Sequence, residues 1–124
     1  MQLFSKILTG LVAIEHVYIL VLEMFLWTTE FGMKRFGTTP EFAAQSQTLA
    51  MNQGLYNGFL AAGLFWALFL LKDHMQFSVQ VFFLGCIVVA GVFGGLTAKP
   101  AIFFIQAIPA LIALIVTVLA ARAK

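Results

Sequence analysis

The sequence has few charged residues and only one cysteine. Asp, Glu, Lys and Arg make up 10% of its 124 residues, whereas 62% are hydrophobic. A soluble chain of this size could not bury so much apolar surface, so the composition indicates that lipid is the solvent. The net charge of +2 is too small and too scattered for nucleic-acid binding. Because Cys86 has no partner, an intrachain disulfide is excluded and the redox compartment stays open.

Four long apolar stretches are present, and each is long enough to cross a membrane. A helical span needs about 20 residues at about 1.5 Å each. Backbone groups in hydrocarbon must satisfy their own hydrogen bonds, which predicts helices. The expected fold is therefore all-α, a single domain built as a four-helix transmembrane bundle in the lipid bilayer. The predicted spans are residues 3–29, 49–71, 77–96 and 101–121.

The connections between these stretches differ in length. Residues 72–76 and 97–100 are short connections, so the helices that they join should be antiparallel neighbours. In the longer first connection, Thr39, Pro40 and Glu41 form a helix-start signal. This signal predicts that the second helix begins near Pro40 and extends beyond the membrane at its N-terminal end. A surface loop followed by a frayed helix is the alternative.

Orientation follows from the basic residues outside the spans. With four spans, both termini lie on the same side of the membrane. Four basic residues fall on that side and three on the other, so the positive-inside rule favours cytoplasmic termini by a narrow margin. The first group is Lys6, Lys72, Arg122 and Lys124, and the second is Lys34, Arg35 and Lys99.

Glycine and proline positions predict how the helices pack. Gly54 and Gly58, and likewise Gly91 and Gly95, are spaced so that neighbouring helices can approach closely. The same glycine faces would permit a homodimer. Pro109 should kink the fourth helix, because proline removes a backbone donor within it.

Ionisable residues interrupt the first span, where hydrocarbon should surround the helix. At 100° per residue, His16 and Glu23 lie about 20° apart on one stripe, which Glu30 continues, and Glu15 lies on its flank. Matching depths across the spans places five more polar residues near the level of this stripe. The polar groups should therefore converge on the half of the bundle farther from the termini. The five are Asn52, Gln53, Tyr56, Asn57 and Gln106.

Such groups are expensive in a membrane and are functional candidates by default, since an acid at a span centre costs about 2.5–3.5 kcal/mol. We expect Glu15, His16 and Glu23 to supply acid–base chemistry and the five amide and phenol residues to bind a ligand. A purely structural network, and helix–helix hydrogen bonding by the amides, are the alternatives. Trp27 is typical of an interface residue. No metal-ligand spacing such as H-x-x-x-H occurs, and no metal or cofactor is expected.

The segments "IEHVYILVLEMFLW" and "MNQGLYNGFLAAGL" resemble a family of small bacterial integral membrane proteins catalogued as domain of unknown function 1304. The resemblance extends over the whole chain. It implies a multi-pass protein of the bacterial plasma (inner) membrane. It supplies no activity, but it points to seven signature positions: Glu15, His16, Glu23, Asn52, Gln53, Tyr56 and Asn57.

Three functions remain open at this stage, and whether the protein is an enzyme is left undecided. The first, which we favour, is a pocket that binds or acts on a small lipophilic molecule such as a quinone, isoprenoid or sterol-like compound. His16 and Glu23 would then be acid and base. The second is a proton-coupled exporter similar to the small multidrug transporters, in which Glu15 would match the acid of the first helix. The third is a structural subunit of a membrane complex.

Overall fold

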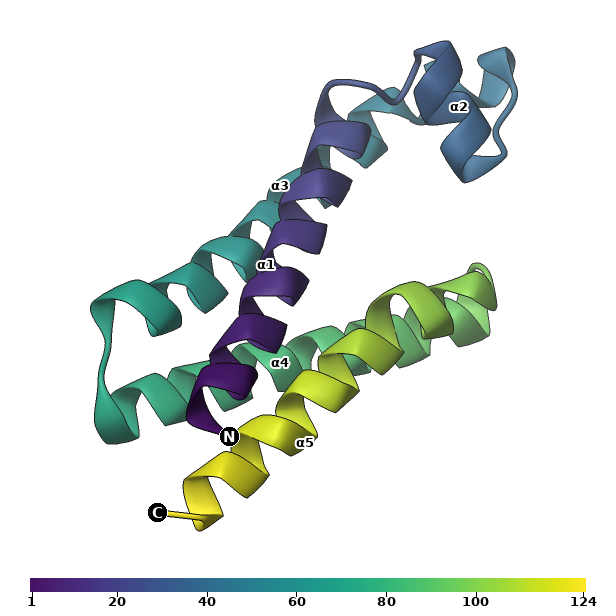
Figure 1. Cartoon of the computed structure of the whole chain (residues 1–124). Helices are drawn as coiled ribbons and strands as arrows, with labels where there is room; N and C mark the ends of the chain where they lie inside the picture. The colour runs from purple at the N-terminus through teal and green to yellow at the C-terminus, as the bar shows by residue number, and fades with distance from the viewer. The chain divides into compact units, whose positions relative to one another are not determined.

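The protein is helical throughout in a computed structural model that describes all of residues 1–124. Four of its helices are long and apolar enough to cross a membrane, which confirms the all-helical prediction with four spans. The fourth of them (Phe103–Arg122) begins with a π-helical turn, and one further short helix completes the chain (Figure 1). In chain order the elements are α1 (Gln2–Met24), α2 (Glu30–Phe36), α3 (Pro40–Leu70), α4 (Asp73–Thr97), η1 (Phe103–Ala107) and α5 (Ile108–Arg122).

The chain forms two compact units. The terminal unit comprises Met1–Ala13 and Ala62–Lys124, and the central unit comprises Ile14–Ala61. Helix α1 is divided about equally between the two units, whereas α3 lies in the central unit up to Ala61 and in the terminal unit beyond it. The terminal unit therefore contains α4 and α5, and the central unit contains α2.

Small residues bring the helices of the terminal unit together, and α4 and α5 run side by side in opposite directions (Figure 1). A Cβ atom added at Gly91 would lie 2.5 Å from the backbone nitrogen and 2.8 Å from the Cα of Ala107. One added at Gly95 would fall on the ring of Phe103. The antiparallel pairing across 97–100 and the packing role of these two glycines are confirmed.

The irregularity predicted at Pro109 takes the form of the π-helical turn η1. The backbone N–H of Ile108 donates to the carbonyl of Phe103, five residues earlier. Pro109, which follows directly, has no N–H to continue an ordinary helical ladder. A wider turn immediately before the proline is one of the known ways in which a helix accommodates such a break.

A buried polar cluster holds the terminal unit together, and the sequence reasoning missed it. Gln80 of α4 donates from Nε2 to Thr9 Oγ1 at 2.6 Å, and to Ser5 Oγ and Thr117 Oγ1 at 3.1 Å each. All four side chains are buried, and the two hydroxyls of Ser5 and Thr117 lie 2.7 Å apart. Polarity is therefore not confined to the half of the protein farther from the termini, as predicted, because this cluster lies at the terminal end.

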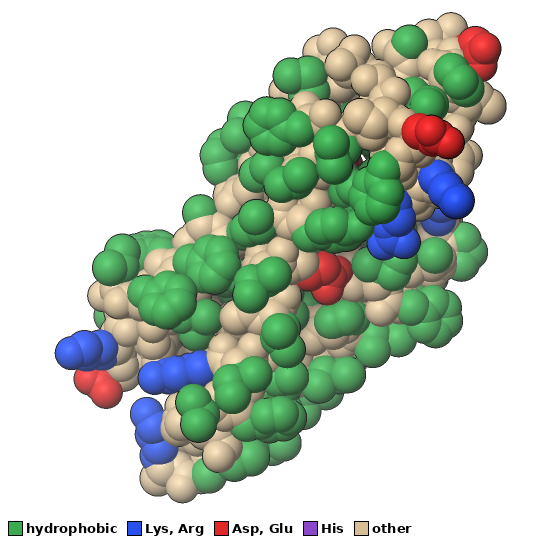
Figure 2. Space-filling model, turned by 45° about the horizontal axis from the view of Figure 1, so that its top comes forward, with side chains coloured by type: hydrophobic (Ala, Val, Ile, Leu, Met, Phe, Trp, Pro, Cys, Tyr) green, Lys and Arg blue, Asp and Glu red, His purple; other side chains and the backbone are tan.

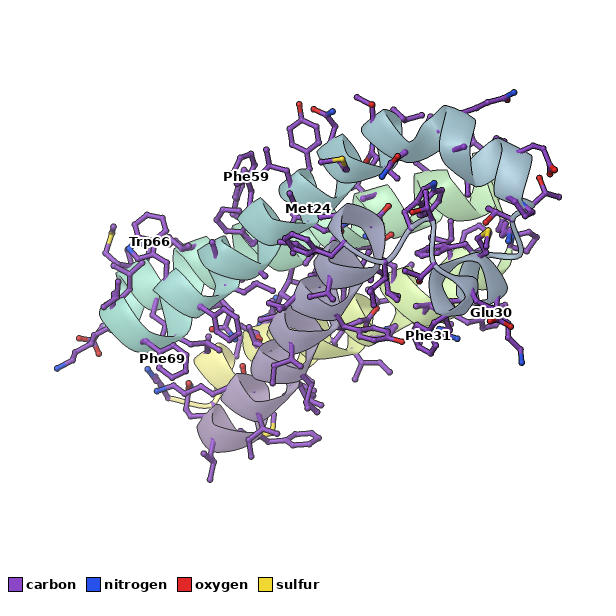
Figure 3. The ribbon with its side chains drawn as sticks, turned by 90° about the horizontal axis from the view of Figure 1, so that it is seen from above. Met24, Glu30, Phe31, Phe59, Trp66 and Phe69 are labelled. Atoms are coloured by element: carbon purple, nitrogen blue, oxygen red, sulfur yellow. The ribbon has the colours of Figure 1, made fainter.

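In the central unit, glycines bring α3 against α1. A Cβ atom at Gly54 would lie 2.6 Å from Met24 Cγ and 3.1 Å from Glu23 Cβ, and one at Gly58 would lie 2.6 Å from Leu20 Cδ1. Met24 lies alongside α3 in Figure 3. The predicted packing role of this glycine pair is confirmed. Because all four glycines of the two pairs pack within the chain, they give no support to a homodimer, which stays a prediction.

Helix α1 ends at Met24, earlier than the apolar run that extends to residue 29. Thr29 starts α2 instead: its Oγ1 accepts from the Gly32 N–H at 3.1 Å and donates to the Leu26 carbonyl at 2.7 Å. Glu30 therefore opens α2, and the prediction that it continues the polar stripe of the first helix was wrong. An N-terminal cap of this kind stabilises a helix by about 1 kcal/mol, which favours a new helix start at Thr29.

Helix α3 begins at Pro40, as the sequence predicted. The Phe42 N–H donates to Thr39 Oγ1 at 3.2 Å, so Thr39 caps the helix and Pro40 occupies its first turn. The helix has 31 residues. Hydrophobic side chains are spread over the whole face seen in Figure 2, and the charged side chains lie in a few separate groups.

Candidate functional site

A carboxyl–amide pair joins two spans in the central unit. Asn57 of α3 donates from Nδ2 to Glu23 Oε1 of α1 at 2.6 Å. The same Nδ2 donates to the backbone carbonyl of Gln53, one turn earlier, at 3.1 Å. The Asn57 amide is therefore fixed by its own helix and directed at the acid. Both side chains are half-buried, and the bond uses only one of the two carboxyl oxygens.

The glycine contact makes this short bond possible. Asn57 lies next to Gly58 and one turn from Gly54, the two residues at which α3 approaches Leu20 and Met24 of α1. An asparagine side chain is short, so it reaches across only where the backbones are close. The sequence thus places the pair where glycines let α3 pack closely against α1.

His16 and Glu15 lie deeper along α1. His16 is completely buried, with 0% of its surface exposed, and lies two turns before Glu23 on the same side of the helix. Glu15 is half-buried, and its Oε1 atom is buried without a hydrogen-bond partner. By helical periodicity Glu15 projects about 140° away from Leu20 and about 180° from Met24, the residues that meet α3. Glu23 therefore contacts α3, whereas Glu15 points away from the residues of α1 that meet α3.

The remaining polar residues of α3 form an arc around that helix. Relative to Asn57, Gln53 lies about 40°, Tyr56 about 100° and Asn52 about 140° around the helix, on the side away from the two glycines. These three are exposed, Tyr56 to 57%. Asn52 donates to the Thr48 carbonyl of its own helix at 2.9 Å. The structure thus brings Asn57 to Glu23, whereas the arc leads away from the acid toward the outer surface of α3.

Gln106 and Trp27 were also singled out from the sequence, and the structure places them elsewhere. Gln106 lies half-buried in η1, within the terminal unit, and its part in a ligand site stays a prediction. Trp27, predicted as an interface residue, donates from Nε1 to Ser46 Oγ at 3.1 Å and packs its ring 4.8 Å from that of Phe36. It thereby ties α2 to α3. No group of three or more His, Cys, Asp or Glu side chains is placed to hold a metal ion.

Four apolar helices of membrane-spanning length, the first of which carries two acids and a buried histidine, define a multi-pass integral membrane protein. Residues 10–118 match the family described as protein of unknown function (DUF1304), and the chain belongs to that family. It is also similar to uncharacterized protein YpaA of Lactococcus lactis subsp. lactis (strain IL1403), with 34% identity over 117 residues that cover 93% of this chain and 97% of the relative. No solved structure matches it significantly. The resemblance predicted from the sequence is confirmed.

Proposed function

We propose that the central unit binds the polar end of a small lipophilic molecule at Glu23 and Asn57, with His16 as the acid–base partner. The hydrogen bond of 2.6 Å between the acid and the amide carries this proposal. An acid inside a span is expensive, and a membrane protein keeps one where it serves a pathway or a site. The bond orients the Glu23 carboxyl and leaves its second oxygen for a hydroxyl or carbonyl group of the ligand.

The polar residues on the exposed side of α3 are open to the bilayer, which supports a lipophilic ligand. The exposed residues Asn52, Tyr56 and Gln53 lead around α3 to Asn57, so a molecule that approaches through the lipid meets polar groups before it reaches the acid. Amides on a lipid-facing surface are unfavourable unless something binds them. A molecule with one polar head and an apolar body, such as a quinone or an isoprenoid alcohol, fits this arrangement.

The depth of the pair fits the same class of ligand. Helix α3, with 31 residues, is about 46 Å long, and the hydrocarbon core is about 30 Å thick. If the excess lies at the N-terminal end, residues 52–57 are about 2–10 Å below the hydrocarbon boundary. A polar head at this depth keeps its apolar body in the acyl chains. His16, about 10.5 Å farther along α1, would meet a second polar group or exchange a proton with the bound molecule.

One observation favours a second candidate, a proton-coupled exporter. Glu15 Oε1 is buried with no hydrogen-bond partner, and a buried acceptor without a partner requires an explanation. A carboxyl that alternately binds a proton and a cationic substrate would explain it. In that case Glu15→Gln abolishes pH-dependent efflux while the helical content is preserved.

Native mass spectrometry after release from mild detergent tests the binding proposal. Wild type should carry a discrete small-molecule adduct, which Glu23→Gln and Asn57→Ala lose. Glu41→Gln, the same change at an exposed acid in the first turn of α3, is the matched control and should retain the adduct. Equal adducts in all four proteins, or none in any of them, would contradict a site at this pair.

A further inference from the structure

The short helix α2 has two distinct faces. Gly32 is buried, and Met33 and Phe36 are half-buried, on the side that packs against the rest of the central unit. Phe31 is 53% exposed, and Lys34 and Arg35 are exposed as well. Since these follow Phe31 by three and four residues, the ring and the two cations share the outer face.

The inner face of α2 is fixed, so its outer face has a defined direction. A Cβ atom at Gly32 would collide with the Leu26 carbonyl, which shows that the helix lies directly on the turn after α1. The ring contact between Phe36 and Trp27, and the bond from Trp27 to Ser46, fasten it to α3. Glu30 and Phe31 are labelled on this helix in Figure 3.

The topology places α2 at the membrane surface. It lies within residues 25–39, between one span that ends at Met24 and another helix that begins at Pro40. Seven residues are too few to cross a bilayer. Exposed aromatic side chains, Phe31 here and Phe25 at 70% in the preceding turn, are unfavourable in water but favourable at the boundary between headgroups and acyl chains.

We propose that Phe31, Lys34 and Arg35 form a surface that binds the headgroup of an anionic phospholipid. The Phe31 ring inserts at the acyl boundary, and the Arg35 guanidinium forms paired hydrogen bonds with the phosphate. Lys34 adds a point charge. Glu30 lies one turn before Lys34, on the flank of α2 away from Arg35. Its negative charge offsets the charge of Lys34, so Arg35 is the main phosphate ligand.

A lipid titration followed by native mass spectrometry tests the charges. Phosphatidylglycerol and phosphatidylcholine are added separately to the detergent-solubilised protein. At about fivefold for an average cation, Lys34→Gln with Arg35→Gln should weaken phosphatidylglycerol binding about 25-fold, and Arg35→Gln alone should account for the larger part of that loss. Phosphatidylcholine binding should not change. Arg122→Gln, at the far end of the chain, removes the only other arginine and is the matched control. The proposal is overturned if the double variant binds phosphatidylglycerol like wild type, or if the control loses as much.

A second measurement tests insertion and does not depend on charge. The Phe31→Cys variant is made in a Cys86→Ser background and labelled at position 31 with an environment-sensitive fluorophore. The labelled protein is placed in bilayers that contain phosphatidylglycerol. Its emission should be blue-shifted and protected from an aqueous quencher, compared with the same label at Glu41→Cys. Equal quenching at the two positions would show that α2 faces water and would overturn the proposal.

Discussion

Asn57 on α3 and Glu23 on α1 are joined by a hydrogen bond of 2.6 Å between helices that both cross the membrane. Asn57→Ala should lower the free energy of unfolding by about 1 kcal/mol, because interhelical hydrogen bonds in membranes are worth about 0.6 to 1.7 kcal/mol. A double-mutant cycle with Glu23→Ala, measured by denaturant titration in bicelles, should give a coupling energy in that range.

Asn52→Ala is the control for this cycle. The Asn52 amide binds only a carbonyl of its own helix among the contacts described, so its loss should change stability by less than about 0.5 kcal/mol and show no coupling to Glu23. Coupling near zero for Asn57, or equal for the two asparagines, would mean that the pair does not fasten α1 to α3.

Two glycines of α4 should respond in opposite ways to the same substitution. Gly91→Ala would place a methyl group against the backbone of Ala107, which cannot move aside cheaply, so it should destabilise the protein by about 1–3 kcal/mol. Gly85 has no neighbouring atom within 4 Å of its added Cβ. Gly85→Ala should be neutral, or stabilising by up to about 1 kcal/mol, because alanine favours the helix. Equal losses of stability in the same titration would show that α4 and η1 are not in close contact.

Much of this fold could be predicted because lipid imposes simple rules. A run of about 20 apolar residues must be a helix, and short connections must join neighbours. Depth matching placed Glu23 and Asn57 at one level, and the structure joins them. It could not separate Asn57 from Asn52 and Tyr56, which share that level, because depth alone does not say which side of a helix faces its partner. The positions of Gly54 and Gly58 indicate which side of α3 faces α1.

The errors have physical causes. Residues 25–29 are apolar enough to continue α1, and only the capping geometry of Thr29 and the end at Gly37, with φ 67°, reveal a separate helix. The Gln80 cluster was hidden because one amide barely changes the hydropathy of a long apolar helix. The spacing of Ser5 and Thr9, one turn apart, was a signal that depth matching at the terminal end could have used.

Gly32→Ala should release α2 without disturbing the spans, because its methyl group would collide with the Leu26 carbonyl. Hydrogen exchange of the amides of residues 30–37 should become faster, while exchange in α3 and α4 stays slow. Phe31→Ala on the outer face of the same helix is the control and should leave those amides protected. If Gly32→Ala exchanged like wild type, the contact between α2 and the turn would not be close.

Gln80→Leu should lower the free energy of unfolding by about 1–2 kcal/mol in bicelles, because it deprives three buried hydroxyls of one donor. Gln47→Leu, at an exposed position of α3, should have little effect. Adding Ser5→Ala, Thr9→Val and Thr117→Val to Gln80→Leu should cost less than the four single changes together, because no side chain of the cluster is then left unpaired. Strictly additive losses would show that these side chains act independently and do not form one network.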